Sequence, residues 1–174
     1  MPNPPDIHHK AGFKPALHKK TPALHHKAGL KPGLNKKTPD IFVLLHPTPD
    51  QIRQIAALYY AQGWFTDYEM LMPDLIPKIV AGCHCFMIAA TESEIVGMGR
   101  SISDRVSDAY IQDVTVNAAY RGMGIGSEII RALIRRLHAD GIRWIGLIAE
   151  QGSSEFYRYL GFEEMGGALP MLKK

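Results

Sequence analysis

The chain has 174 residues, of which 46% are hydrophobic and 21% are charged, and its formal net charge is +3. This composition supports one domain with a buried core and excludes a chain that is disordered throughout. No apolar run approaches the ~20 residues of a membrane span, and the charged N-terminus lacks the apolar segment of a secretory signal. The only two cysteines, Cys83 and Cys85, are interpreted as small buried side chains rather than as metal ligands. We therefore expect a cytoplasmic protein with no membrane association.

The first 39 residues differ in composition from the rest of the chain. They contain eight lysines and one acid, Asp6, so this segment has a net charge of +7 and the remainder −4. Residues 8–24 and 25–41 form a repeat in which 12 of 17 positions match. Proline recurs every few residues and prevents regular helices and sheet ladders. We predict a flexible basic arm over residues 1–39 and one folded domain over residues 40–174.

Three roles for the arm remain open. The simplest is a solvated extension without catalytic function, or an appendage foreign to the natural protein. A tether to nucleic acid or to an anionic surface would use the lysines, although Phe13 is the only aromatic residue here that could stack on a base. A weak metal-binding tract would use the histidines His8, His9, His18, His25 and His26. Outside the arm we expect no contact with nucleic acid.

The first half of the domain predicts one strand followed by helices. Residues 41–45 read as a short apolar strand. Asp50 is a candidate N-cap for a helix that runs to about Gln62. Four residues share one face of that helix: Ile52, Ile55, Ala56 and Tyr59. A second, less regular helix is expected over about residues 68–80, where Pro73 and Pro77 interrupt it.

The second half predicts the rest of an α/β fold. Strands at about residues 85–91, 95–103 and 109–116 are joined by short turns, which implies an antiparallel meander. Residues 124–139 form a helix with an apolar stripe of Ile125, Ile129, Ile130, Leu133, Ile134 and Leu137. The continuous apolar run 144–149 predicts a central strand covered on both faces. A short helix over 154–160 with Ser153 as its cap, and a hairpin over 162–165 and 169–172, complete the mixed sheet.

The most informative stretch is Arg-Gly-Met-Gly-Ile-Gly at residues 121–126, between the third strand of the meander and the long helix. Glycines leave backbone N–H groups uncovered at the positive end of the helix dipole, where a phosphate binds well. Arg121 adds a charge suited to a pyrophosphate. A Walker A loop is excluded because the turn has no lysine, and a dinucleotide fingerprint fits poorly because Ser127 stands at its third glycine position. The alternative is that the glycines only allow the helix and the strand to pack closely. This role accounts for one glycine but not well for three.

Two motifs carry a family resemblance. Residues 113–126 resemble motif A of the GNAT superfamily of N-acetyltransferases, (Gln or Arg)-x-x-Gly-x-(Gly or Ala) after a strand. Residues 156–162, Phe-Tyr-Arg-Tyr-Leu-Gly-Phe, resemble its motif B. The resemblance implies a GNAT-like fold with a mixed, mostly antiparallel central sheet, helices on both faces and strands splayed around the cofactor. It also implies acetyl-CoA as the co-substrate.

The resemblance further implies which residues hold acetyl-CoA. The pyrophosphate would lie on the backbone of the glycine turn, and the pantetheine arm would pair with the preceding strand like an additional strand. The implied cofactor-binding residues are Val114, Thr115, Val116, Arg121, Gly122, Met123, Gly124, Ile125, Gly126, Ser127 and Ser153. No metal is implied.

The chemistry requires a neutral amine, a donor to the developing oxyanion and a proton for the departing thiolate. The backbone N–H of Val114 is the expected oxyanion donor. Tyr157 matches the motif B tyrosine and is the expected general acid; packing on the sheet is its alternative role. Asp113 is the candidate base, with a hydrogen-bonding role in a strand bulge, a water relay, or no dedicated base as alternatives. Asp67 and Glu69 fall in the implied acceptor loop.

Glu150 departs from the family pattern, since many members have Asn there, so no family role is carried over to it. The acidic domain favours a cationic amine acceptor, either a small molecule or a peptide. A homodimer is common in such folds and is one candidate assembly here, but the sequence leaves the oligomeric state open. Two other readings stay open: a non-catalytic CoA-binding sensor or binding module with a basic tether, and a pseudoenzyme whose biology lies in the arm.

Overall fold

The structure is a computed structural model that describes residues 38–150 and 152–173. Described residues 38–166 belong to one compact unit, and residues 167–173 belong to a second unit and carry no helix or strand. The arm predicted over residues 1–39 lies outside the described residues, apart from Thr38 and Pro39. Within the described ranges, no helix has the length and apolar character needed to cross a membrane.

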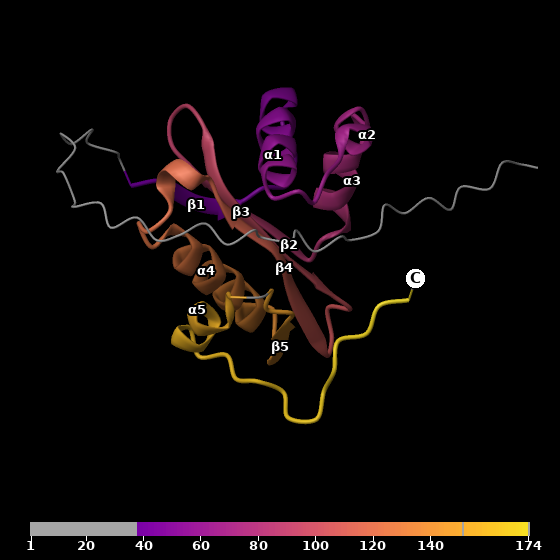
Figure 1. Cartoon of the computed structure of the whole chain (residues 1–174), viewed down its shortest axis with the longest axis vertical. Helices are drawn as coiled ribbons and strands as arrows, with labels where there is room; N and C mark the ends of the chain where they lie inside the picture. Colours follow the sequence, from indigo (N-terminus) through magenta and orange to yellow (C-terminus); the bar gives the residue numbers. More distant parts are fainter. Residues whose placement is uncertain (1–37, 151, 174) are drawn as a thin grey trace, which may run out of the picture. The chain divides into compact units, whose positions relative to one another are not determined.

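A five-stranded sheet organises the first unit (Figure 1), in the order β1-β2-β3-β4-β5. Its strands are β1 (Asp40–Val43), β2 (Cys85–Ala90), β3 (Ile95–Ser103), β4 (Asp108–Val116) and β5 (Trp144–Leu147). The first four pair antiparallel in sequence order, and β5 pairs parallel to β4. The predicted mixed and mostly antiparallel sheet is therefore confirmed, and the bounds of the three meander strands differ from the prediction by at most one residue.

Helices cover both faces of this sheet (Figure 1). One face carries α1 (Pro49–Ala61), α2 (Asp67–Met70) and α3 (Leu75–Gly82), and the other carries α4 (Ile125–Ala139) and α5 (Ser154–Tyr159). A short 3-10 helix, η1 (Ala118–Tyr120), joins β4 to the turn before α4. Each face has its own core cluster, because sheet residues alternate between the two sides. Cys83 and Cys85 are both buried as expected, but they pack in different clusters.

Two local predictions for the first helices are corrected. The N-cap of α1 is Thr48 rather than Asp50: Thr48 Oγ1 accepts from the Gln51 N–H at 3.3 Å, and Gln51 Oε1 accepts from the Thr48 N–H at 2.9 Å. This reciprocal pair, followed by a proline at the first helical position, fixes the start of the helix. The expected helix over residues 68–80 is two helices, because Pro73 lies between α2 and α3.

The prediction that residues 144–149 form a central, fully covered strand is wrong. Among the described strands β5 lies at the edge of the sheet, it ends at Leu147, and Trp144 is 44% exposed. The expected hairpin over 162–172 carries no strand in the described residues either. The apolar character of β5 serves local packing instead: the Trp144 ring contacts Tyr110 edge-on at 5.3 Å and covers Gly146.

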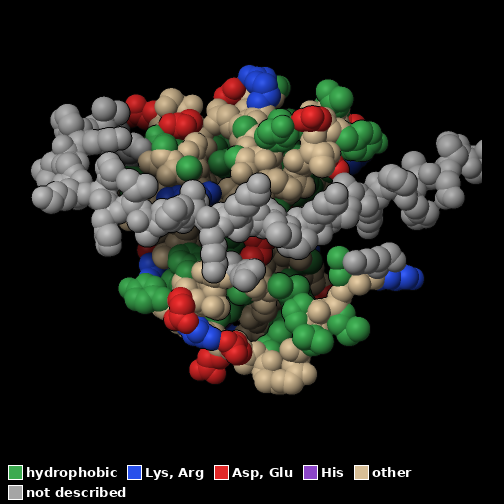
Figure 2. Space-filling view, in the orientation of Figure 1, with side chains coloured by type: hydrophobic (Ala, Val, Ile, Leu, Met, Phe, Trp, Pro, Cys, Tyr) green, Lys and Arg blue, Asp and Glu red, His purple; other side chains and the backbone are tan. Residues whose placement is uncertain are grey.

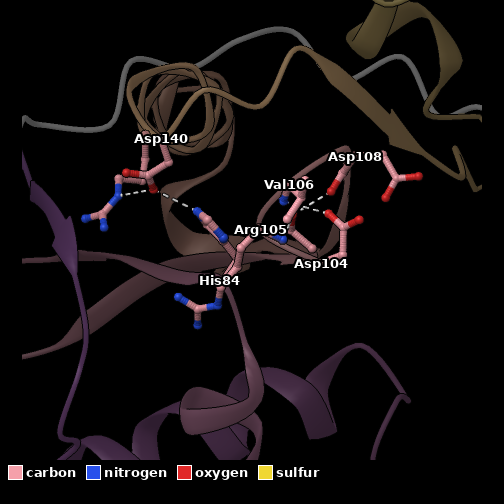
Figure 3. A network of polar contacts seen from close by, with 8 residues as sticks. His84, Asp104, Arg105, Val106, Asp108 and Asp140 are labelled. Carbon is pink, nitrogen blue, oxygen red and sulfur yellow. Dashed lines mark hydrogen bonds and ion pairs between the residues drawn. The ribbon is translucent and has the colours of Figure 1, made fainter.

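Two polar arrangements fix the ends of the elements far from the glycine turn (Figure 3). The His84 side chain points to Asp140, with Nε2 and Oδ2 2.8 Å apart, and Arg136 Nε donates to the same oxygen at 2.6 Å. Hydrogen bonds from Arg136 and His84 lower the pKa of Asp140. The C-terminal end of α4 is thus tied to the start of β2. In the second arrangement, in the turn between β3 and β4, Asp104 Oδ1 accepts from the N–H groups of Val106 and Ser107.

Close packing between α4 and β3 depends on a missing side chain at Gly99. A Cβ there would lie 2.9 Å from Ile129, 3.2 Å from Val114 and 3.3 Å from Leu133, all carbon atoms of packed side chains. We expect Gly99→Ala to destabilise the protein by about 1–3 kcal/mol because the core is overpacked. Urea unfolding measures this change. The control is Gly82→Ala at the end of α3, where a Cβ meets nothing within 4 Å and stability should not fall. Equal stability of the two variants would contradict the packing argument.

Candidate active site

The edge of β4 that faces β5 loses its partner halfway along the strand. β4 pairs with β5 only from Asp108 to Ile111, opposite Trp144 to Leu147. In the described part of the chain, residues 112–116 have no strand on this side, so their backbone N–H and C=O groups are left for another partner. Three implied pantetheine residues lie here: Val114, Thr115 and Val116. The pairing of β4 with β5 therefore ends in the region where the resemblance implies that the two strands part.

A bulge in β4 accompanies this loss of pairing. Met98 pairs with Thr115 and Arg100 pairs with Gln112, so Asp113 and Val114 both oppose the single residue Gly99. Asp113 has a φ of 54°, in the left-handed region that non-glycine residues seldom adopt. Such a conformation costs about 1–3 kcal/mol and persists only where surrounding contacts hold it.

Asp113 is held by two donors from two different elements. Tyr59 Oη on α1 donates to its Oδ2 at 2.7 Å, and Arg100 Nε on β3 donates to the same oxygen at 2.5 Å. Burial, and then the Asp113 carboxylate, raise the pKa of Tyr59. Burial opposes the charge of Arg100, but its hydrogen bond and attraction to Asp113 outweigh this and raise its pKa. Both donors therefore keep their protons near neutrality, which favours the hydrogen-bonding role of Asp113 over the general-base role.

Sequence reasoning missed Tyr59 and Arg100 as site residues. The sequence pattern places Tyr59 only on the apolar face of its helix and indicates no role for Arg100. One signal was present: Arg100 is the only charged residue in the run 95–103, and a buried arginine needs an acidic partner.

The glycine turn leads into a helix end whose N–H groups are not capped. Gly122 and Gly124 both have a φ of 78°, which a side chain would strain. Gly124 is the N-cap of α4 and provides no side-chain hydrogen bond. A groove of about 360 Å³ lies beside this helix end, and its lining includes Met123, Gly124, Ile125 and Ser127. Uncapped N–H groups at the positive end of a 15-residue helix favour an anion.

The Arg121 side chain does not lie at the N-terminus of α4, where the sequence predicts a phosphate site. Its Nε donates to the carbonyl of Val116 at 3.1 Å, and the residue lines a second groove, of about 450 Å³, along α1. Gln54 and Asn117 line that groove as well. Arg121 therefore ties the turn to the end of β4, and it does not line the groove beside the α4 N-terminus.

Tyr157 lies on α5 and packs against the same core cluster as Val114, Val116 and Leu147. Its ring contacts Phe156 edge-on at 5.1 Å and Phe162 at 6.0 Å. Burial, and then the negative charge of Glu150, raise the pKa of Tyr157. The hydroxyl of this side chain therefore stays protonated at neutral pH, as a general acid requires.

Ser153 is engaged in the turn before α5. Its Oγ donates to the Glu150 carbonyl at 2.7 Å and makes no hydrogen bond to the helix it precedes. It is thus the N-cap by position, as predicted, but not by side-chain bonding. Nothing in these contacts places Ser153 beside the α4 groove.

Helix α2, which follows α1 in the chain, contains the other acidic candidates. Asp67 Oδ1 accepts from Tyr60 Oη at 3.1 Å, and Glu69 Oε2 accepts from the Thr66 N–H at 2.8 Å as part of a capping box. Hydrogen bonds from Thr66 lower the pKa of Glu69. Figure 2 shows hydrophobic side chains on the surface over α2 and α3. The exposed apolar residues of this region are Tyr68, Met70, Leu71 and Met72.

Comparison with known sequences agrees with this geometry. The sequence profile described as the acetyltransferase (GNAT) family matches residues 49–162. The chain is 43% identical over 72 residues to histone acetyltransferase TAP1 of Glycine max, which is 41% of this chain and 31% of that protein. It is 39% identical over 72 residues to GCN5-related N-acetyltransferase 2, chloroplastic, of Arabidopsis thaliana, which is 41% of this chain and 28% of that protein. The chain thus spans about a third of the length of these curated relatives.

Solved structures share the fold. A GNAT family acetyltransferase from Streptococcus pneumoniae superposes with a TM-score of 0.60 at 20% identity, over 78% of this chain and 98% of that one. Glucosamine-6-phosphate N-acetyltransferase from Arabidopsis thaliana gives a TM-score of 0.59 at 17% identity, over 78% and 98% of the two chains. At these identities the likeness shows the fold alone, whereas the sequence profile covers more than half of the chain. The chain belongs to the acetyltransferase (GNAT) family.

Proposed function

We propose that this chain transfers an acetyl group from acetyl-CoA to a primary amine. The observation that carries the proposal is the uncapped N-terminus of α4, which directly follows two left-handed glycines. It comes together with the end of β4, which among the described strands has no partner on the β5 side. The helix end suits the pyrophosphate, and the open edge of β4 suits the two amides of pantetheine. The turn and the strand would bind this ligand through backbone N–H and C=O groups, so the site does not require a charged side chain.

In the proposed reaction the amine nitrogen attacks the acetyl carbon, a C–N bond forms and the C–S bond breaks. The N–H of Val114 donates to the acetyl oxygen, on which negative charge develops. The Tyr157 hydroxyl gives its proton to the departing thiolate and regains one from water. Because Asp113 is engaged by two donors and Glu69 by a cap, we assign the removal of the amine proton to water.

The acceptor is proposed to be a cationic amine. Residues 40–174 carry a net charge of −4, and an exposed apolar surface lies over α2, so an amine with an apolar portion suits this side. One relative is named a histone acetyltransferase, so a lysine-containing peptide belongs in any screen beside small amines. The homodimer and the cytoplasmic location stay predictions; another relative is named chloroplastic.

The proposal is tested by titrating CoA into the full chain. We expect a Kd in the micromolar range and a melting temperature that rises with CoA concentration, since saturation to about 100 times Kd stabilises by about 2.7 kcal/mol. A panel of primary amines with acetyl-CoA, read out as free thiol, then identifies the acceptor class. No thermal shift at millimolar CoA would contradict the proposal. Binding without thiol release for every amine would favour the non-catalytic CoA sensor.

A further inference from the structure

We infer that Tyr59 and Arg100 are positioning residues for acetyl transfer: through Asp113 they fix the β4 bulge, and with it the direction of the Val114 N–H. This inference rests on the function proposed above and adds to it a device that orients the oxyanion donor. Neither side chain is required to touch the acetyl group.

The identity of the residue in the bulge is the first argument. When the first residue of a two-against-one bulge adopts a left-handed conformation, it is ordinarily glycine, because glycine has no side chain to strain. Here the position is Asp113, with a φ of 54°. The aspartate supplies what glycine lacks, a carboxylate that other elements can hold.

The second argument is that the holding elements are themselves fixed. Tyr59 is 3% exposed, stacks on Phe65 at 4.4 Å between ring centroids and contacts Trp64 edge-on at 5.9 Å. Arg100 Nη2 also donates to Gln112 Oε1 at 3.0 Å, one residue before the bulge. Both side chains therefore hold Asp113 from a helix and a strand, and each has further contacts of its own that fix its position.

The third argument is that residues of the bulge make contacts on both faces of the sheet. Tyr59 belongs to the core cluster on the α1 side, whereas Val114 packs in the cluster on the α4 side. The peptide group between Asp113 and Val114 is thus held by hydrogen bonds on one face and by apolar packing on the other. A donor held in one orientation stabilises developing charge without reorganising during the reaction.

The test measures the acetyl carbonyl directly and needs no acceptor. Acetyl-CoA labelled with ¹³C at the carbonyl is bound to the full chain, and its C=O stretch is recorded by isotope-edited infrared spectroscopy. In the wild type we expect a lower frequency than in water, because the Val114 N–H donates to the oxygen. Tyr59→Phe should lose most of this shift. In the separate amine assay it should lower kcat about 10-fold, a fraction of the ~10²–10³-fold effect of a whole oxyanion donor. The Kd of CoA should change less than about 2-fold, because the helix end sets it.

Matched variants separate positioning from general damage. Tyr60→Phe makes the same change one residue along α1, where the hydroxyl bonds Asp67 and the side chain is 49% exposed, and it should leave the band unmoved. Asp113→Gly keeps a residue that suits the φ of the bulge but removes the anchor, so it should lose the shift as Tyr59→Phe does.

Two results would overturn the inference, and only the first of them would also refute the proposed function. A wild-type chain that binds no acetyl-CoA refutes the proposed function, and the inference with it. A wild-type chain that binds acetyl-CoA with a lowered carbonyl frequency, together with unchanged spectra in both Tyr59→Phe and Asp113→Gly, refutes the inference alone.

Discussion

Tyr157→Phe is expected to lower kcat for acetyl transfer by about 10²–10⁴-fold, the range for loss of a general acid. The change removes one hydroxyl and keeps the aromatic ring, whose edge-on contacts with Phe156 and Phe162 hold α5 on the core. The fold and the Kd of CoA should therefore change little, and the loss should fall on kcat. Steady-state kinetics with free-thiol detection, together with CoA titration, measure both quantities.

The pH dependence gives this prediction a second readout. Burial and Glu150 raise the pKa of Tyr157 above its ordinary value of about 10. The wild-type rate should therefore rise with pH while the amine loses its proton, and fall only above about pH 10, where Tyr157 ionises. Tyr157→Phe should keep the rise and lack the fall, because it has no proton to lose.

The control for this variant is Tyr159→Phe on the same helix. Tyr159 is 80% exposed and lines the groove beside the N-terminus of α4. Its hydroxyl takes no part in the proposed proton transfer, so the kcat of Tyr159→Phe at saturating acetyl-CoA should match that of the wild type. A Tyr157→Phe enzyme with wild-type kcat would mean that water or another group protonates the thiolate. Tyr157 would then be a packing residue, the alternative role considered for it from the sequence.

The parts of the fold that could be predicted are those with a strong local period. The apolar stripe of residues 124–139 matches α4 within one residue, and four of its six members are completely buried. The strand predicted over 95–103 matches β3, because its apolar run is bounded by clear turn residues. In both segments, local pattern and tertiary burial favour the same conformation.

The parts that could not be predicted depend on residues distant in sequence. The length of an apolar run does not say whether a strand is central, so the edge position of β5 was missed. The anchor of Asp113 joins residues 54 and 13 positions away, which no local pattern connects. The glycine turn could be identified because positive φ values select glycine, but the direction of the Arg121 side chain could not.

Ser127→Glu is expected to affect cofactor binding and stability in opposite directions. Ser127 lies in the first turn of α4 and lines the groove beside the helix end. A carboxylate there, about 5 Å from a bound pyrophosphate at an effective dielectric constant of about 20, adds roughly 3 kcal/mol of repulsion. The Kd of CoA should therefore rise about 100-fold or more. The same carboxylate interacts favourably with the helix dipole and should stabilise the free protein by about 0.3–1 kcal/mol.

This opposition of signs makes the result specific to an anion site, because a variant that merely damaged the fold would lose stability and affinity together. In Ser127→Gln the new side chain has nearly the same size as glutamate but no charge, so this variant should bind CoA almost as well as the wild type. Ala118→Glu places a carboxylate in the other groove, beside Arg121, and should leave the Kd of CoA unchanged. Weak CoA binding by Ala118→Glu and normal binding by Ser127→Glu would instead assign the pyrophosphate to the groove along α1. In that case Arg121, rather than the uncapped helix end, would be its main partner.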